Sequence, residues 1–244
     1  MGFTHNARAA FAAAVLSLFA GCGMTAADIS SEGESGFYTM AGQVQSWPQN
    51  SRIQASFGRN FPYRLRHAVA LGASTYNDLL ESVRIEINAD SEVDGSDDMD
   101  PQSVAGDGVN GVYWLEETWP WAESHPDSDA MTVVRFNQGS IVEADVYFRA
   151  RSYASRAEIW ATTSENRASR LPESHRETKL EDMSAQDRWL YLIAVHEFGH
   201  ALGRAHVHDH DSIMAPAVSM KRLLEPFTNF DLEVLSSVYP LKSK

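Results

Sequence analysis

HEFGHALGRAH, residues 196–206, is the stretch of this 244-residue chain on which its fold and chemistry depend. On a helix, residues four positions apart lie on one face, so His196 and His200 can direct their imidazoles to a single point. Gly203 suits the end of that helix, because a residue without Cβ readily takes a left-handed conformation. The chain can then turn back and bring His206 to the same point, which a straight helix could not easily do.

Three neutral imidazoles are a favoured ligand set for zinc, with a fourth position left open for water. The motif therefore predicts three zinc ligands: His196, His200 and His206. Glu197 is next to the first ligand, and its carboxylate can take a proton from the water, which makes it the predicted general base. His208 and His210 follow in the same loop and are interpreted as loop residues or as weak secondary ligands.

A second motif, SIMAP at residues 212–216, follows the third histidine. The two motifs together resemble those of the metzincin zinc proteases, in which a methionine turn underlies the metal, and Met214 is the matching residue. HEFGHALG and SIM-x-P are close to matrixin wording, and FTNFDLEVLSSVY at residues 227–239 resembles the matrixin C-terminal helix. The similarity is good over about 186–240, with weaker support back to about residue 50.

This resemblance implies an α+β, metzincin-like catalytic domain with a five-stranded mixed sheet, a long zinc-binding helix and a C-terminal helix. It also implies an endopeptidase, in which a zinc-activated water attacks a peptide or protein substrate, Glu197 is the general base and Met214 forms a hydrophobic floor. Two positions depart from matrixin wording, because Val207 stands where serine is usual and Ala215 where tyrosine is usual. The matrixin cysteine switch is also missing, since Cys22 is the only cysteine.

Two other functions stay open. An anchored protein could bind zinc without turnover, although the intact Glu197 speaks against this. Alternatively, the same zinc-activated water could hydrolyse a non-protein amide. Substrate choice depends on the pocket beside the zinc, and we expect residues 217–227 to line it.

Residues 1–22 have the pattern of an export signal. Positive charge at the N-terminus and Arg8 precedes an apolar run over 9–20, which is too short to span a bilayer comfortably. FAGC at residues 19–22 resembles a bacterial lipobox, whose cysteine becomes the lipidated first residue after cleavage. We therefore expect an exported protein, anchored to a bacterial envelope membrane through Cys22. The alternative is ordinary cleavage beside an incidental thiol, giving a secreted protein.

Residues 23–45 are predicted to be a flexible tether, because the run over 23–36 is small, polar and acidic. Residues 46–244 are long enough for one domain with a sizeable core. The net charge of −13 argues against nucleic acid as a partner, since phosphate binding needs a basic face. No pattern indicates the oligomeric state.

Alternation of polar and apolar residues predicts the strands of the sheet. Five are expected, at residues 52–57, 83–87, 109–115, 131–136 and 141–148. A helix over 62–80 follows the first strand, and the zinc helix is predicted to run from an N-cap at Ser184 to Leu202. The strand segment 132–136 is predicted to be an unpaired edge, which could pair with an extended substrate.

Residues 90–100 are rich in carboxylates and glycine, a composition that can bind calcium through oxygen ligands. Their spacing does not match an EF-hand loop, and a solvated acidic loop is the other interpretation. Calcium is therefore a candidate second cofactor beside one catalytic zinc.

Overall fold

The structure, a computed structural model, describes residues 18–21, 36–40, 42–94, 101–104, 106–153, 180 and 183–243. Its main sheet has six strands in the order β1-β7-β8-β6-β4-β5. These strands are β1 (Leu18–Gly21), β4 (Ser51–Gly58), β5 (Val83–Val93), β6 (Asn110–Leu115), β7 (Ala130–Asn137) and β8 (Ser140–Arg149). A small second sheet pairs β2 (Thr39–Met40) with β3 (Gln43–Val44).

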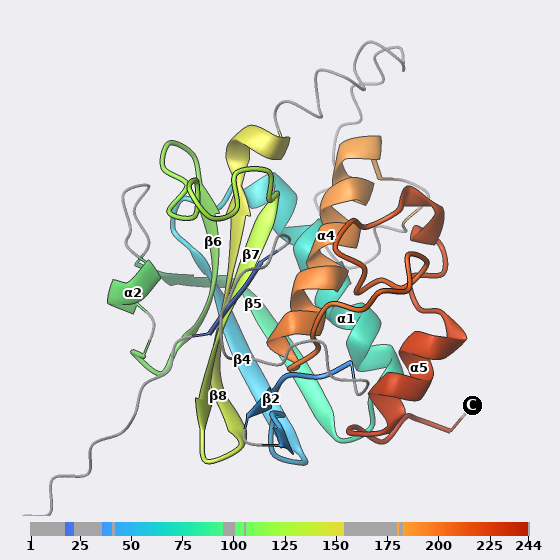
Figure 1. The fold of residues 1–244 in the computed structure, drawn as a ribbon. Helices are drawn as coiled ribbons and strands as arrows, with labels where there is room; N and C mark the ends of the chain where they lie inside the picture. The colour runs from blue at the N-terminus through green and yellow to red at the C-terminus, as the bar shows by residue number, and fades with distance from the viewer. Residues whose placement is uncertain are drawn as a thin grey trace, which may run out of the picture.

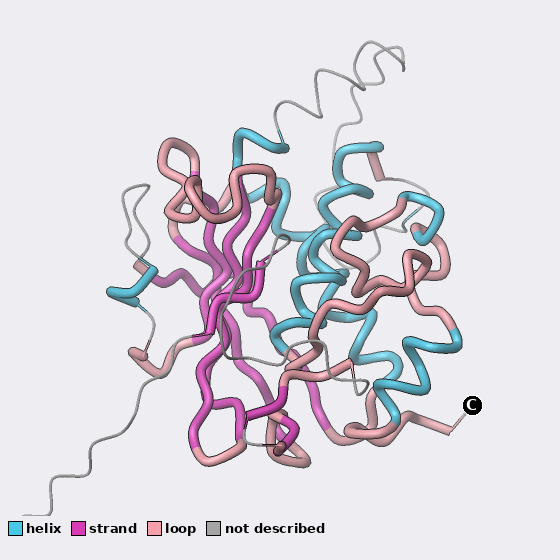
Figure 2. Tube along the Cα trace, in the orientation of Figure 1, coloured by secondary structure: helices cyan, strands magenta, loops and turns pink. Residues whose placement is uncertain are grey.

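The helices are η1 (Tyr63–Leu65), α1 (Arg66–Leu79), α2 (Pro101–Val104), α4 (Ala185–Ala201), η3 (Met220–Arg222) and α5 (Asn229–Ser236). Helices α1 and α4 cover one face of the main sheet (Figure 1). The mostly irregular segment between α4 and α5 runs beside α4 on the side away from the sheet (Figure 2). Among the described residues, no helix combines the length and the apolar character needed to cross a bilayer.

The sheet is mixed, as predicted. Strand β4 pairs in parallel with both β5 and β6, and β6 pairs in parallel with β8, while β7 and β8 form an antiparallel hairpin. The hairpin turns through Gln138 and Gly139, which both have positive φ. The five predicted strands correspond to β4–β8, and the predicted helix over 62–80 corresponds to η1 and α1.

Strand β5 is longer than predicted, and the predicted acidic loop is wrong over its first part. The register shifts between Ser56 and Phe57, where β5 contains extra residues, and Phe57 and Gly58 then pair with Glu92 and Val93, so the acidic run begins as strand. The pairing is supported by Arg66, whose buried guanidinium lies 2.8 Å from a Glu92 carboxylate oxygen. Residues 95–100 lie outside the described residues, and the calcium prediction stays a prediction there.

A sixth strand is the main correction to the predicted sheet. Strand β1 pairs antiparallel with β7, placing Leu18 opposite Val134 and Gly21 opposite Met131. The edge of β7 is therefore paired, and the predicted unpaired edge over 132–136 is wrong. Backbone groups on an open strand edge readily pair with an extended segment. That partner belongs to the predicted export segment 1–22, and Cys22 itself lies outside the described residues.

The folded domain also begins before the predicted boundary at residue 46. Phe37 and Tyr38, within the predicted tether, are buried. The Tyr38 N–H donates to the carbonyl of Gly203 at 2.9 Å, and the Ala205 N–H donates to the carbonyl of Gly36 at 3.1 Å. Burial of two aromatic rings offsets the entropy of ordering this segment. Residues 36–38 thereby pack against the turn that follows α4, at residues 203–205.

Helix α4 is buried on nearly every side from Leu190 onward. Its N-cap is Ser184, as predicted, whose hydroxyl accepts a hydrogen bond from the Asp187 N–H at 3.1 Å. The α1 helix approaches closely at Gly72, where an added Cβ would lie 2.7 Å from the Cβ of Ala194. The site is therefore built on a helix whose position is fixed by packing between α1 and the sheet.

Gly203 ends the α4 segment in a left-handed conformation with a φ of +92°, and an added Cβ would clash with the Gln45 carbonyl oxygen. We expect Gly203→Ala to lower the free energy of unfolding by more than about 2 kcal/mol, from backbone strain plus the clash. Gly42→Ala is the control, because Gly42 has a φ of +76° and open space around it. It should cost about 1 kcal/mol. Equal losses in urea unfolding of the two variants would contradict this reading.

Candidate active site

Helix α4 and the turn after it bring the three predicted ligands together. His196 and His200 lie on one face of α4 and are fully buried, and His206 is partly buried beyond the Gly203 turn. The three Nε2 atoms form a triangle with sides of 3.1, 3.2 and 3.2 Å. Within the described part of the chain, this is the one group of three such side chains with clustered ligand atoms.

The backbone sets the proton on two of these rings. His196 Nδ1 lies 2.7 Å from the Ile213 carbonyl oxygen, and His200 Nδ1 lies 2.8 Å from the Arg204 carbonyl oxygen. A carbonyl only accepts, so each Nδ1 carries the proton and each Nε2 presents a lone pair. Lone pairs that converge at this distance repel one another unless a cation lies between them.

The geometry fits zinc. Tetrahedral zinc with imidazole bonds of about 2.0–2.1 Å places its ligand nitrogens roughly 3.3 Å apart. The sides of the Nε2 triangle are close to this value. His208 and His210 are exposed and lie outside the group of clustered ligand atoms.

Burial keeps the imidazoles neutral. It lowers the pKa of His196 to about 4, and burial with the neighbouring His196 ring lowers the pKa of His206 to about 3. Burial and both neighbouring rings place the pKa of His200 well below its usual value. A neutral imidazole is the form that binds a metal, so the protein favours the ligand state over the protonated state near neutral pH.

Glu197, the predicted general base, has a fully buried carboxyl side chain. Its Oε2 accepts a hydrogen bond from the Thr132 hydroxyl at 2.6 Å, and its Oε1 has no hydrogen-bond partner among the described residues. Burial raises the pKa of Glu197 to about 8, opposed by the Thr132 hydrogen bond and reinforced by Asp129. A cation held by the adjacent imidazoles would lower this pKa, because it favours the carboxylate form.

Met214 lies against the backbone of α4 at Gly199. An added Cβ at Gly199 would overlap the Met214 sulfur and would lie 2.7 Å from the Tyr76 hydroxyl oxygen. Met214 is fully buried, and its carbonyl accepts a hydrogen bond from the Val207 N–H at 3.0 Å. The glycine inside the histidine motif is therefore required by the close approach of the methionine turn.

The buried carboxylate of Asp231 connects the methionine turn to the segment that contains Arg204 and His206. Asp231 of α5 is fully buried and lies 2.9 Å from the Arg204 guanidinium, which is also fully buried. It accepts further hydrogen bonds from the Ser212 hydroxyl, the Ile213 N–H and Thr228. Burial favours the neutral acid, but Arg204 and these hydrogen bonds outweigh it and hold the pKa of Asp231 below its usual value.

Sequence reasoning missed several residues that support the site. Arg204 falls between the fixed letters of the motif, and its partner Asp231 is 27 residues later. A capping box at Thr228 was the available signal for Asp231, because that pattern requires an acceptor three residues later. Tyr38 was assigned to the tether, yet its hydroxyl lies 3.0 Å from His200 Nδ1.

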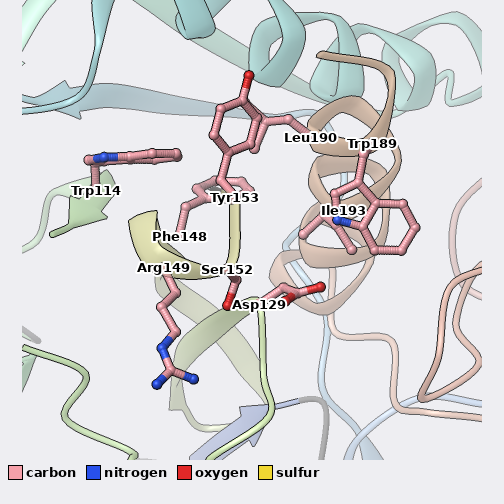
Figure 3. A pocket seen from close by; sticks show the side chains of 9 residues that line it. All are labelled: Trp114, Asp129, Phe148, Arg149, Ser152, Tyr153, Trp189, Leu190 and Ile193. Atoms are coloured by element: carbon pink, nitrogen blue, oxygen red, sulfur yellow. The ribbon is translucent and has the colours of Figure 1, made fainter. Parts of the chain in front are cut away.

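A pocket lies between the first half of α4 and the ends of β6 and β8 (Figure 3). One side is formed by Trp114 and Phe148 of the sheet and by Tyr153. The opposite side is formed by Trp189, Leu190 and Ile193 of α4. Asp129, which precedes β7, contributes a carboxylate to the lining. None of residues 217–227, expected to line the substrate pocket, contributes to this one.

The ligand triangle predicts about one zinc per chain in the purified protein. His206→Ala should lower zinc content measured by mass spectrometry, because it removes one corner of the triangle. His208→Ala is the matched control and should retain the metal, since this imidazole is exposed and outside the group. Zinc retained in full by His206→Ala would overturn the ligand assignment.

The Asp231 contacts predict a large loss of stability in Asp231→Asn. Leaving the Arg204 charge buried without its partner should cost about 3–5 kcal/mol in urea unfolding at pH 7. Glu233→Gln on the exposed face of the same helix should change stability by less than about 0.5 kcal/mol.

The pH dependence of stability tests whether the charge of Asp231 causes this loss. The pKa of Asp231 is lower in the folded protein, so its contribution is present above the unfolded value of about 3.9 and is lost as pH falls through the folded value. The difference in the free energy of unfolding between wild type and Asp231→Asn should therefore become smaller in strong acid. A difference that does not change with pH would show that the carboxylate charge has no part in it.

Comparison with known proteins agrees with this geometry. The matrixin family model matches residues 84–240, which include β6–β8, the histidine motif, the methionine turn and α5. Over 51 residues the chain is 41% identical to matrix metalloproteinase-27 of Tupaia belangeri, a match covering 20% of this chain and 10% of that protein. Because that match spans a tenth of the relative, it says little about the rest of either protein. The family match covers more than half of the chain, and the chain belongs to the matrixin family.

Proposed function

We propose that this protein is a zinc-dependent endopeptidase that hydrolyses peptide bonds in peptide or protein substrates. The observation that carries the proposal is the set of three converging imidazole nitrogens together with the buried carboxylate of Glu197, the residue that follows His196, one oxygen of which has no hydrogen-bond partner among the described residues. Membership of the matrixin family supports it. No second function is favoured by a specific contact in the site.

In this mechanism His196, His200 and His206 hold the metal. Zinc bound there supplies Lewis acidity, which lowers the pKa of a bound water to about 7 and polarises the substrate carbonyl. Glu197 accepts the proton of the attacking water and later delivers it to the leaving amine. The buried surroundings exclude other water, which strengthens the electrostatic interactions of the reacting groups.

Strand β7 is the proposed binding edge for an extended substrate. In the structure this edge pairs antiparallel with residues 18–21, so it accepts an extended backbone in that direction. A substrate and residues 18–21 cannot occupy the same edge together. Removal of the predicted export segment 1–22 would leave the edge free for substrate.

We also propose that the protein is exported and either anchored at a bacterial envelope through a lipidated Cys22 or secreted. The chain has one cysteine, so no thiol after residue 22 can cap the metal. On this proposal the mature enzyme, from residue 22 onward, is active once it has folded with zinc. The acidic residues 90–100 are the candidate calcium site, and the proposed chemistry does not use them.

Glu197→Gln tests the function, using the chain without residues 1–22 and a peptide library. It should keep zinc and fold but lose roughly 10²–10⁴-fold in rate, because an amide cannot act as the general base. Glu117→Gln, at an exposed glutamate, is the control and should cleave at the wild-type rate. Wild-type activity in Glu197→Gln would refute the mechanism, and no metal-dependent cleavage by the wild type would refute the function.

A further inference from the structure

The Glu197 carboxylate is held asymmetrically. Its Oε2 accepts a hydrogen bond from the Thr132 hydroxyl at 2.6 Å, while its Oε1 has no hydrogen-bond partner in the part of the chain that the structure describes. Both side chains are fully buried. The Thr132 hydroxyl also lies 3.2 Å from the Glu197 carbonyl oxygen, but it has a single proton. The contact to the carboxylate is the shorter of the two, so the proton is directed to the carboxylate.

The strand pattern explains why Thr132 is the donor. Side chains of β7 alternate between faces, so Met131 and Val133 join the cluster on the far side of the sheet. Ala130 and Val134 face the main core with α4, and neither offers a hydrogen bond. Thr132 lies between them on the helix side and places the hydroxyl opposite Glu197.

The hydrogen bond from Thr132 restricts rotation about the terminal torsion of the Glu197 side chain. The terminal torsion of a glutamate side chain has a broad, roughly two-fold preference, so either oxygen could face the reacting water. A threonine side chain is stiff at χ1, because two heavy atoms branch from its Cβ. Its hydroxyl is therefore already aimed, and the hydrogen bond selects one orientation of the carboxylate.

We propose that Thr132 is a positioning residue, which holds Oε2 of Glu197 and leaves Oε1 as the oxygen that meets the reacting water. This inference rests on the proposed peptidase function. Thr132 acts through Glu197 and touches neither metal nor substrate in this role. The competing explanation is structural, namely that the hydroxyl only satisfies a buried acid.

The experiment compares Thr132→Val, which keeps the branched shape without the hydroxyl, with Thr132→Ser, which keeps the hydroxyl. In the purified zinc-loaded protein, Thr132→Val should lower kcat at least about tenfold, the effect of losing one hydrogen bond to a charged group. KM should change by less than about threefold, since substrate binding is not altered. Thr132→Ser should restore kcat to within about threefold of wild type. Zinc content should match wild type in both variants.

A spectroscopic measurement separates this inference from the proposed function. The infrared carboxyl band of Glu197 is identified as the band missing in Glu197→Gln. It should shift in Thr132→Val and return to its wild-type position in Thr132→Ser. This result does not require turnover, so it tests the contact even if the wild type cleaves no peptide.

Three outcomes would overturn the inference. An unshifted carboxyl band in Thr132→Val would show that the hydrogen bond does not hold Glu197. An unchanged kcat in that variant would show that the bond does not matter to the reaction. A loss of kcat in Thr132→Ser as large as in Thr132→Val would assign the effect to packing rather than to the hydroxyl. A shifted band and a reduced kcat, both restored by serine, would support it.

Discussion

The buried ion pair between Arg204 and Asp231 is the interaction on which the rest of the site depends. The carbonyl of Arg204 fixes the ring of His200, and the carbonyl of Ile213 fixes the ring of His196. Asp231 contacts Arg204 through its guanidinium and Ile213 through its N–H. A single carboxylate on α5 therefore sets the position of both carbonyls that orient imidazoles. Such outer contacts commonly contribute to metal affinity as much as to stability.

The site also depends on close approaches that require small residues. Gly199 allows Met214 to lie against α4, and Gly72 allows α1 to pack on the same helix. Gly203 then reverses the chain in a conformation that other residues rarely adopt. These three positions keep the ligand helix, the methionine turn and the third ligand within a few ångströms of one another. The burial that results is what lowers the imidazole pKa values.

Much of the fold and the clustering of the three histidines could be predicted because the signals are local. The zinc helix, its Ser184 cap and the Gly203 turn are each encoded within a few residues. Contacts between distant segments could not be predicted. The sixth strand needs residues 18–21 to meet a strand more than a hundred residues later, and the sequence there indicates an export signal instead.

The same limit applies to the candidate site. Thr132 is 65 residues from Glu197, and a single threonine in an apolar strand is an ordinary β residue until its neighbour across the core is known. Tyr38 lies in a segment whose composition favours a tether, yet it contacts a residue 162 positions later. Periodicity and spacing identify elements and ligands, whereas supporting residues depend on how those elements pack.

X-ray absorption at the zinc edge of the purified protein tests the central claim most directly. The account predicts three imidazole nitrogens and one oxygen, all at about 2.0–2.2 Å. It also predicts that Asp231→Asn, which leaves all three ligands in place, increases the spread of those distances. Only two imidazoles around the metal, or a sulfur ligand at about 2.3 Å, would contradict the account.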